Sequence, residues 1–343
     1  MASPTTPSST ATTPECTTAV PGPHGYVPPS SCNALYLYNP SFSAAVAFAV
    51  LFGLLTIAHI LLAILHRKRF CWVIITGAIW ELTSFILRAL GTRNQQNEAY
   101  ATASTLLFLL APLWINAFVY MTAGRLVYFL HPRKRLWGIE AVKMGRWFVW
   151  LDILSFIVQA AGGLMMNQEN GAKVIGIGKN IYMSGVGVQQ LFILIFLGMI
   201  VRFHLDMLKL ERDGRLCDND GRWRSVMIWK WLTYTLYAVL GLITIRIIFR
   251  LVEFSAGIDE SANALIGTEG YALGLDAVPM MFALSLLAAV HPGVVLRGPG
   301  SEFPSRKERK LERKARKTEK KSRKADPTVE ENVCRDGVTS HHV

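Results

Sequence analysis

The sequence predicts an all-α polytopic membrane protein built as a single bundle of seven transmembrane helices. Two features of composition predict this class: 51% of the 343 residues are hydrophobic and only 17% are charged. An average soluble domain carries about 25% charged residues. The third observation is that the apolar residues gather in runs of roughly twenty, the length at which a helix spans a hydrocarbon core of about 30 Å. Such a helix also satisfies its own backbone hydrogen bonds.

Seven segments have this length and composition. In chain order we expect them at residues 42–65, 71–90, 101–124, 147–166, 181–201, 226–248 and 271–291. The connections between them are short, so residues 42–298 form one bundle without room for a second folded domain. Residues 1–41 are rich in Ser, Thr and Pro and predict a disordered external segment. Residues 299–343 are expected to form a basic cytoplasmic tail.

Lys and Arg outside the spans predict the orientation. Twenty-nine of them lie in the first, third and fifth connections and the C-terminal tail, against four in the N-terminal segment and the other connections. The positive-inside rule then places the C-terminus in the cytoplasm and the N-terminus outside. The basic excess behind the net charge of +12 is therefore expected on the cytoplasmic side of the membrane.

The C-terminal tail contains a polybasic run from Arg306 to Lys324, with twelve basic and three acidic residues. We expect anionic lipids of the inner leaflet as its partner, because attraction amounts to about 1 kcal/mol per basic residue near the surface. A solvated tail or a trafficking signal is the alternative interpretation. No aromatic residues are interleaved with these charges, so nucleic-acid binding is not expected. The oligomeric state is not readable from the sequence.

Charged side chains within or beside the spans mark candidate sites, because each costs at least about 2.5 kcal/mol at mid-bilayer. The candidates for substrate binding or coupling are Glu81, Arg88, Arg246, Arg250, Glu253, Glu269 and Asp276. Glu81 lies at mid-depth, and the other six, three positive and three negative, crowd the outer third. One interpretation is a buried ion network that fixes helix register. The other is an outward-facing cleft that contacts the zwitterionic or cationic head group of an amphiphile, or relays protons.

A second set of polar residues is expected to form hydrogen bonds between helices. It consists of His59, Asn116, Arg125, Asp152, Gln159 and Gln189. Asp152 begins the fourth span and is expected to pair with Arg125 at the end of the third. Kinks or close helix approaches are predicted at Pro112, Pro279 and the glycine pairs Gly162–Gly163 and Gly185–Gly187.

Several functional classes lack their motifs. The histidines within the spans stand alone, so the histidine cluster of zinc-dependent seven-helix hydrolases is absent. The last span has no lysine for a retinal Schiff base, and no P-loop, GxSxG or HExxH occurs. We therefore expect no enzyme activity, no metal and no cofactor. The third span ends in Gly-Arg125 without an acidic neighbour and the seventh in His291-Pro292, unlike G-protein-coupled receptors.

Five segments between residues 36 and 298 carry a combined pattern. They are YNPS (38–41) with His59, Glu81-x6-Arg88, LLAPLWINAFVYMTAGR (109–125), DILSFIVQAAGG (152–163), and RIIFRLVEFSAG (246–257) followed by Glu269, Tyr271, Asp276 and His291-Pro292. Together they resemble the fungal lipid-translocating exporters, also called the aminocholesterol-resistance family, which are seven-helix membrane proteins. In that family the aspartate more often follows the tyrosine by two or three residues, which implies a larger share of the role for Glu269 here.

The resemblance also implies a function. Members are implicated in export or transbilayer movement of sphingoid bases and phospholipids, in porphyrin traffic, and in resistance to sterol analogues and other toxic amphiphiles. We therefore expect an ATP-independent plasma-membrane transporter of amphiphilic lipids or lipophilic toxins. The outer charges would recognise the head group and Glu81 would change protonation. The alternative is a receptor-like sensor of lipid asymmetry that signals through its basic cytoplasmic loops.

Overall fold

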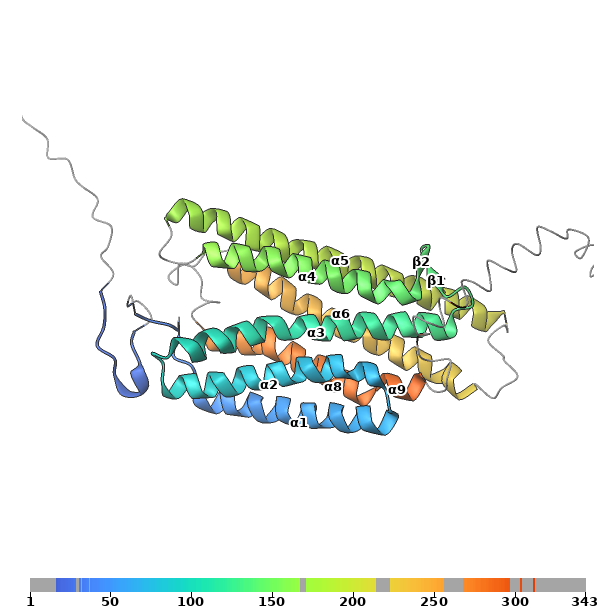
Figure 1. The fold of residues 1–343 in the computed structure, drawn as a ribbon, viewed down its shortest axis with the longest axis horizontal. Coiled ribbons are helices and arrows are strands. Elements are labelled where there is room, and N and C mark those ends of the chain that lie inside the picture. The colour runs from blue at the N-terminus through green and yellow to red at the C-terminus, as the bar shows by residue number, and fades with distance from the viewer. Residues whose placement is uncertain are drawn as a thin grey trace, which may run out of the picture. The chain divides into compact units, whose positions relative to one another are not determined.

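Seven helical segments of the described residues are long and apolar enough to cross a membrane, as the sequence predicts. The computed structural model (Figure 1) describes residues 17–28, 31, 33–36, 38–166, 171–213, 223–255, 268–296, 303 and 311, with the backbone only for 172 and 223–228. The first six spans are the helices α1 (Phe42–His66), α2 (Trp72–Arg93), α3 (Glu98–Leu130), α4 (Ala141–Met165), α5 (Ala172–Arg212) and α6 (Trp223–Ser255). The seventh runs through α7 (Glu269–Ala272), the π-helical turn η3 (Leu273–Ala277), α8 (Val278–Ala289) and the short α9 (Pro292–Val295).

Short elements complete the described chain. The 3-10 turns η1 (Pro23–Gly25) and η2 (Arg69–Cys71) precede α1 and α2, and the strands β1 (Arg135–Leu136) and β2 (Ile139–Glu140) form an antiparallel hairpin between α3 and α4. We call the end where α1 begins, α2 ends and α7 begins the N-terminal end of the bundle. The opposite end, which holds the β1–β2 hairpin and α9, is the C-terminal end (Figure 1).

Most helices extend beyond the predicted spans. The largest difference is α5, which has 41 residues where the sequence predicts a span over 181–201. Hydropathy identifies only the part of a helix that suits lipid, whereas the backbone continues helical through polar residues until it is capped. At the starts of α1 and α3 the caps are Ser41, whose side chain accepts from the backbone N–H of Ala44, and Asn97, which accepts from that of Tyr100.

The helices pack in an order that follows the chain. α2 packs against α1 and α3, α4 against α3 and α5, and α6 against α5 and α8. Figure 1 shows α4 and α5 side by side along one flank of the bundle, with α1, α2 and α8 on the other. Rings of Tyr120, Phe148 and Phe196 meet where α3, α4 and α5 come together, with centroids 4.5–5.5 Å apart. α3 therefore joins the two flanks.

Part of the N-terminal segment contacts the α2–α3 connection. The backbone N–H of Gln95 donates to the carbonyl oxygen of His24 at 2.9 Å, and the side chain of Gln96 donates to that of Gly25 at 3.0 Å. The segment predicted to be disordered covers residues 1–41, of which residues 1–16 lie outside the described residues. The chain divides into two compact units, residues 1–298 and 299–343. The polybasic run Arg306 to Lys324 also lies outside the described residues, apart from Leu311.

A close backbone approach between two helices involves Gly162 of α4. A Cβ added there would lie 2.5 Å from the backbone N of Tyr182 and 2.7 Å from the carbonyl oxygen of Gly178, both on α5. Glycine is thus required for this contact, because a methyl group would force the two backbones apart. The neighbouring Gly163 faces open space, since nothing lies within 4 Å of an added Cβ. Of the two, the predicted close approach is confirmed for Gly162 only.

Replacing Gly162 with alanine is expected to destabilise the fold by about 1–3 kcal/mol, the usual cost of overpacking a filled site. The matched variant Gly163→Ala is expected to be neutral or slightly stabilising, because alanine favours a helix over glycine by about 1 kcal/mol. Thermal unfolding of both variants in the same detergent measures the difference. Equal melting temperatures would contradict the close approach of α4 and α5.

Candidate functional site

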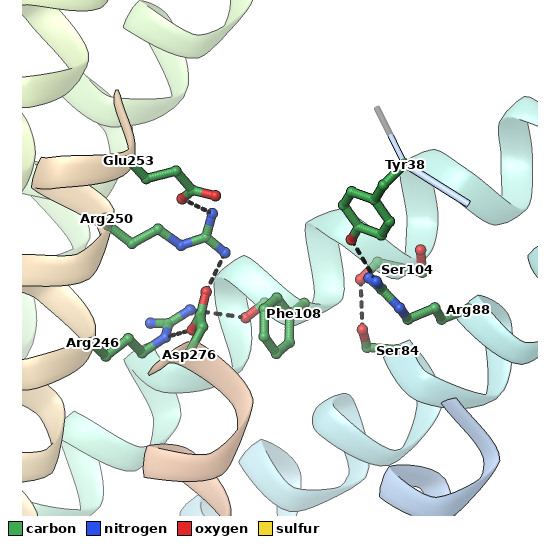
Figure 2. A network of polar contacts seen from close by, with 9 residues as sticks. All are labelled: Tyr38, Ser84, Arg88, Ser104, Phe108, Arg246, Arg250, Glu253 and Asp276. Carbon is green, nitrogen blue, oxygen red and sulfur yellow. Dashed lines mark hydrogen bonds and ion pairs between the residues drawn. The ribbon is translucent and has the colours of Figure 1, made fainter. Parts of the chain in front are cut away.

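A buried carboxylate on the seventh span binds two arginines of α6. Asp276 is 0% exposed; its Oδ1 accepts from Nε of Arg246 and its Oδ2 pairs with Nη2 of Arg250 (Figure 2). Arg250 also binds Glu253 at 2.9 Å, and Arg246 donates to the carbonyl oxygen of Phe108 on α3 at 3.3 Å. We call Arg246, Arg250, Glu253 and Asp276 the Asp276 cluster. The spacings of four and three along α6 put its three members on one helical face, as the sequence predicts.

The local backbone of the seventh span explains how Asp276 reaches α6. Residues Leu273–Ala277 form a π-helical turn between two α-helical segments. A π-turn accommodates one extra residue within a continuous helix and rotates the residues that follow. This turn lies within the five-residue spacing from Tyr271 to Asp276. Asp276 lies at the centre of the buried charges.

A second ion cluster lies on the other side of Phe108 (Figure 2). Arg88 of α2 binds Glu269 of α7 at 2.9 Å, and the same guanidinium donates to the hydroxyl of Tyr38. The other oxygen of Glu269 accepts from the backbone N–H of Ser41 at 2.7 Å. We call Arg88, Glu269, Tyr38 and Ser41 the Arg88 cluster. It ties the start of α1 and the start of α7 to the end of α2.

The six charges predicted to crowd together are therefore divided between two clusters. A cavity of about 500 Å³ lies between them, with wall residues contributed by both. Its wall is mixed, with charged and hydroxyl groups set among apolar side chains, and we call it the polar cavity. Its polar or aromatic lining comprises Tyr36, Tyr38, Ser84, Phe85, Arg88, Thr102, Ser104, Thr105, Phe108, Arg250 and Glu253. Burial raises the pKa of the Tyr36 hydroxyl, which keeps this group neutral in the wall. The sequence does not predict that Tyr38 binds Arg88 or that the backbone of Ser41 binds Glu269, although both residues lie in the YNPS segment.

A second cavity adjoins the first and has a different character. This apolar cavity, about 370 Å³, lies among α3, α4, α5 and α6, and most of its wall consists of Leu, Val, Ile and aromatic side chains. Three uncharged polar residues, Asn116, Gln159 and Gln189, interrupt the apolar wall. Arg250 lines both cavities, and so does Leu106. The Asp276 cluster thus stands where the polar cavity meets the apolar one.

Glu81 is placed apart from both clusters. It is 0% exposed, and among the described residues neither of its carboxyl oxygens has a hydrogen-bond partner. Its electrostatic interactions are with Arg246 and Asp276. A buried ionised carboxylate without a donor is costly. Glu81 is thus a buried carboxyl group without a direct hydrogen bond to the Asp276 cluster.

The partners of Asp152 differ from the prediction. Its Oδ2 accepts from the side-chain N–H of Asn116 at 3.2 Å and from the hydroxyl of Tyr120 at 3.0 Å, whereas the sequence predicts Arg125. The physical reason is depth: α4 begins at Ala141, six residues before the predicted span, so Asp152 faces α3 further inside the bundle. Arg125 lies 4.0 Å from the centre of the Phe70 ring and donates to the carbonyl oxygen of Met121.

The other polar residues of the second set contact neighbouring helices. Gln159 donates to the side-chain oxygen of Gln189 at 2.9 Å, which joins α4 to α5. Nε2 of His59 lies 3.1 Å from the carbonyl oxygen of Leu284, which joins α1 to α8. These contacts leave both glutamines on the wall of the apolar cavity. They hold helices together and add polar groups to an otherwise apolar surface.

Comparison with known proteins gives one family match. Residues 74–299 match the family described as RTA1 like protein. The chain is 47% identical over 312 residues, 90% of its length and 81% of the relative's, to "Probable lipid transporter atnI" of Emericella nidulans. It is 26% identical over 286 residues (73% of this chain, 89% of the relative) to "Protoporphyrin uptake protein 1" of Saccharomyces cerevisiae. "Sphingoid long-chain base transporter RSB1" of Saccharomyces cerevisiae is 22% identical over 304 residues (80% and 78%). No solved structure gives a significant match.

Removing the charge of Asp276 is expected to be strongly destabilising. Asp276→Asn leaves two arginines in the interior without their shared carboxylate, and breaking a buried pair in this way costs about 3–5 kcal/mol. The control is Glu211→Gln, because Glu211 pairs with Lys230 at 2.9 Å at the surface. An exposed pair is worth only about 0–1 kcal/mol. Equal losses of thermal stability in the two variants would show that the Asp276 cluster is not a structural centre.

Proposed function

The chain belongs to the RTA1-like protein family and is a multi-pass membrane protein, and from this premise we propose that it moves amphiphilic lipids or lipophilic toxins across the membrane without ATP. One observation carries the proposal: a polar cavity between charged clusters opens beside an apolar cavity, and Arg250 lines both. The relatives' names, which include a probable lipid transporter and a sphingoid long-chain base transporter, support the same substrate class.

The two cavities match the two parts of an amphiphile. Glu253 and Arg250 offer charges of both signs at the wall of the polar cavity, which suits a zwitterionic or cationic head group. Each of these charges already has a protein partner, so a head group would bind by exchanging partners rather than by neutralising a bare charge. The aliphatic wall of the apolar cavity would receive the hydrocarbon portion, because apolar lining favours burial of apolar surface.

We further propose that the N-terminal end of the bundle faces the outside and that the protein resides in the plasma membrane. The distribution of Lys and Arg over the connections supports this orientation. The polar cavity would then open toward the outer leaflet. In this arrangement the polybasic run Arg306 to Lys324 meets the anionic inner leaflet. Two of the relatives are named as transporters. These names favour transport over an enzyme activity and over the receptor-like alternative.

Filling the apolar cavity is expected to block transport. Leu113 lines this cavity, and Leu113→Trp should lower the initial flux of a labelled sphingoid base in proteoliposomes by about fivefold or more. The indole would occupy the space proposed for the hydrocarbon portion, and fitting both into it would cost at least about 1 kcal/mol. The matched variant is Leu154→Trp, since Leu154 of α4 is 58% exposed on the surface of the bundle. It should retain the wild-type flux.

Two results would oppose the proposal. One is wild-type protein that moves neither labelled sphingoid base nor labelled phospholipid, with or without a pH gradient. The other is a Leu113→Trp variant that retains full flux, which would exclude the apolar cavity from the path. Both variants should elute as monodisperse protein with wild-type helical content, so that a loss of flux is not a loss of fold.

Glu81 is proposed as the group that exchanges a proton during transport. If its protonation couples flux to a proton gradient, Glu81→Gln should abolish the response of flux to an imposed pH difference, because glutamine cannot take up or release a proton. Flux without a gradient should persist. Glu211→Gln serves as the control and should respond to the gradient like the wild type. A full gradient response in Glu81→Gln would place the coupling elsewhere.

A further inference from the structure

A third hollow lies at the C-terminal end of the bundle, and its lining residues differ from those of both transport cavities. It is a groove of about 750 Å³ between the β1–β2 hairpin and the last turns of α5. We call it the basic groove; its charged lining consists of Arg133, Arg135, Arg202, Lys209 and Asp206, together with His131. Neither the family pattern nor the proposed transport path uses these residues.

The charge of the basic groove favours an anion. Four of its side chains are permanently positive and one is negative. The negative group, Asp206, is already engaged: it lies 3.2 Å from Arg202 and 3.7 Å from His131. Burial lowers the pKa of His131, so this ring adds little positive charge of its own at neutral pH. Arg135 also pairs with Glu140, at 3.3 Å and outside the groove. The positive charge offered to a ligand with several acceptor oxygens, such as a phosphate group, therefore comes chiefly from Arg133 and Lys209.

The hairpin beside the groove has an unusual tip. Trp137 and Gly138 are the two residues between β1 and β2, and their φ angles are 47° and 78°. Two positive φ angles define a tight turn in which Asn-Gly or Gly-Gly is the common choice. A tryptophan with positive φ is uncommon and costs backbone energy. The side chain held in this position is 60% exposed, so packing within the bundle does not account for it.

The contact that Trp137 makes with α5 indicates how deep its indole ring lies in the membrane. A Cβ added to Gly198 would lie 3.3 Å from Cη2 of the Trp137 ring. Arg202 and Lys209 follow on the same helix by four and eleven residues, or about 6 and 16 Å at 1.5 Å per residue. Because α5 crosses the bundle toward its C-terminal end, the indole lies deeper than the basic groups. Tryptophan is enriched at this interfacial level, where the membrane changes from hydrocarbon to head groups.

We propose that the basic groove binds the phosphate group of an anionic membrane lipid, with Trp137 contacting the lipid below its phosphate. The layering supports a lipid over a soluble anion, because only a lipid presents an apolar part directly beneath its charge. Basic groups near an anionic surface each contribute to attraction, and this groove arranges four of them around one hollow. The site is built from other residues than the polybasic run Arg306 to Lys324 and does not depend on the transport proposal.

Quenching of tryptophan fluorescence by brominated lipids tests the site in the full-length protein. The protein is placed in nanodiscs of phosphatidylcholine that contain either phosphatidic acid or phosphatidylcholine with brominated acyl chains. The signal of Trp137 is the difference between each protein and the same protein carrying Trp137→Phe. We expect brominated phosphatidic acid to quench this signal at a lower mole fraction than brominated phosphatidylcholine.

Charge variants identify the groove as the source of the preference. Arg202→Gln with Lys209→Gln should raise the mole fraction of phosphatidic acid needed for half-quenching by about fivefold per charge removed, the equivalent of about 1 kcal/mol each. Arg146→Gln is the matched control, because Arg146 is an exposed residue of α4 near the same end and lies outside the groove. It should behave like the wild type. If the double variant unfolds, either single variant gives the fivefold shift alone.

Three outcomes would overturn the proposal. Equal quenching by the two brominated lipids would show that the groove does not select an anionic head group. An unchanged preference in the Arg202 and Lys209 variants would assign the attraction to other basic segments. Inorganic phosphate that alters the Trp137 signal in pure phosphatidylcholine nanodiscs, without any preference for phosphatidic acid, would identify the ligand as a soluble anion.

Discussion

The bidentate pairing of Asp276 with Arg246 and Arg250 is the interaction on which the rest of the site depends. Three charges are removed from solvent there, and such burial is tolerated only with well-formed pairing. The pairing fixes the rotation of α6 against the seventh span, because both arginines must face one carboxylate. It requires the π-helical turn at Leu273–Ala277, which brings Asp276 onto that face. The same rotation places Arg250 on the boundary between the polar and apolar cavities.

The ion pairs near this constraint fall into two kinds. Some hold the helices together, and others are able to exchange their partner for a ligand. Asp276 is fully buried and held by two arginines, so its pairs are structural. Glu253 and Arg88 border the polar cavity, and the side chains of Arg88 and Glu269 are 18% and 13% exposed. Exchange of partners costs least where solvent or a head group replaces the lost contact. A ligand would therefore compete at Glu253 and Arg88, while the pairs of Asp276 with Arg246 and Arg250 keep the helices in register.

Hydropathy predicts the seven spans well because each helix must present about twenty apolar residues to lipid, wherever it sits in the bundle. It does not define where helices end in polar surroundings, so α5 is longer than expected. Helical periodicity places Arg246, Arg250 and Glu253 on one face, but pairing across helices depends on rotation and depth, which sequence spacing does not contain. For this reason Asp152 binds Asn116 and Tyr120 instead of Arg125, and six charges form two clusters instead of one. The basic groove is not predictable from the sequence for the same reason, because it is formed by a hairpin and by residues about seventy positions later in the chain.

The two ends of the bundle differ in the net charge of their clustered side chains, and the difference suits the membrane leaflet proposed for each end. The clusters at the N-terminal end contain three basic and three acidic residues, so their sum is neutral and selects no ligand by net charge. The basic groove has four basic side chains against one acidic residue, and such an excess favours anions at any exposed position. On the proposed orientation, the neutral end faces the outer leaflet and the basic end faces the anionic one. The transport site would then be free to accept head groups of different charge, because the attachment of the protein to its anionic leaflet rests on separate residues.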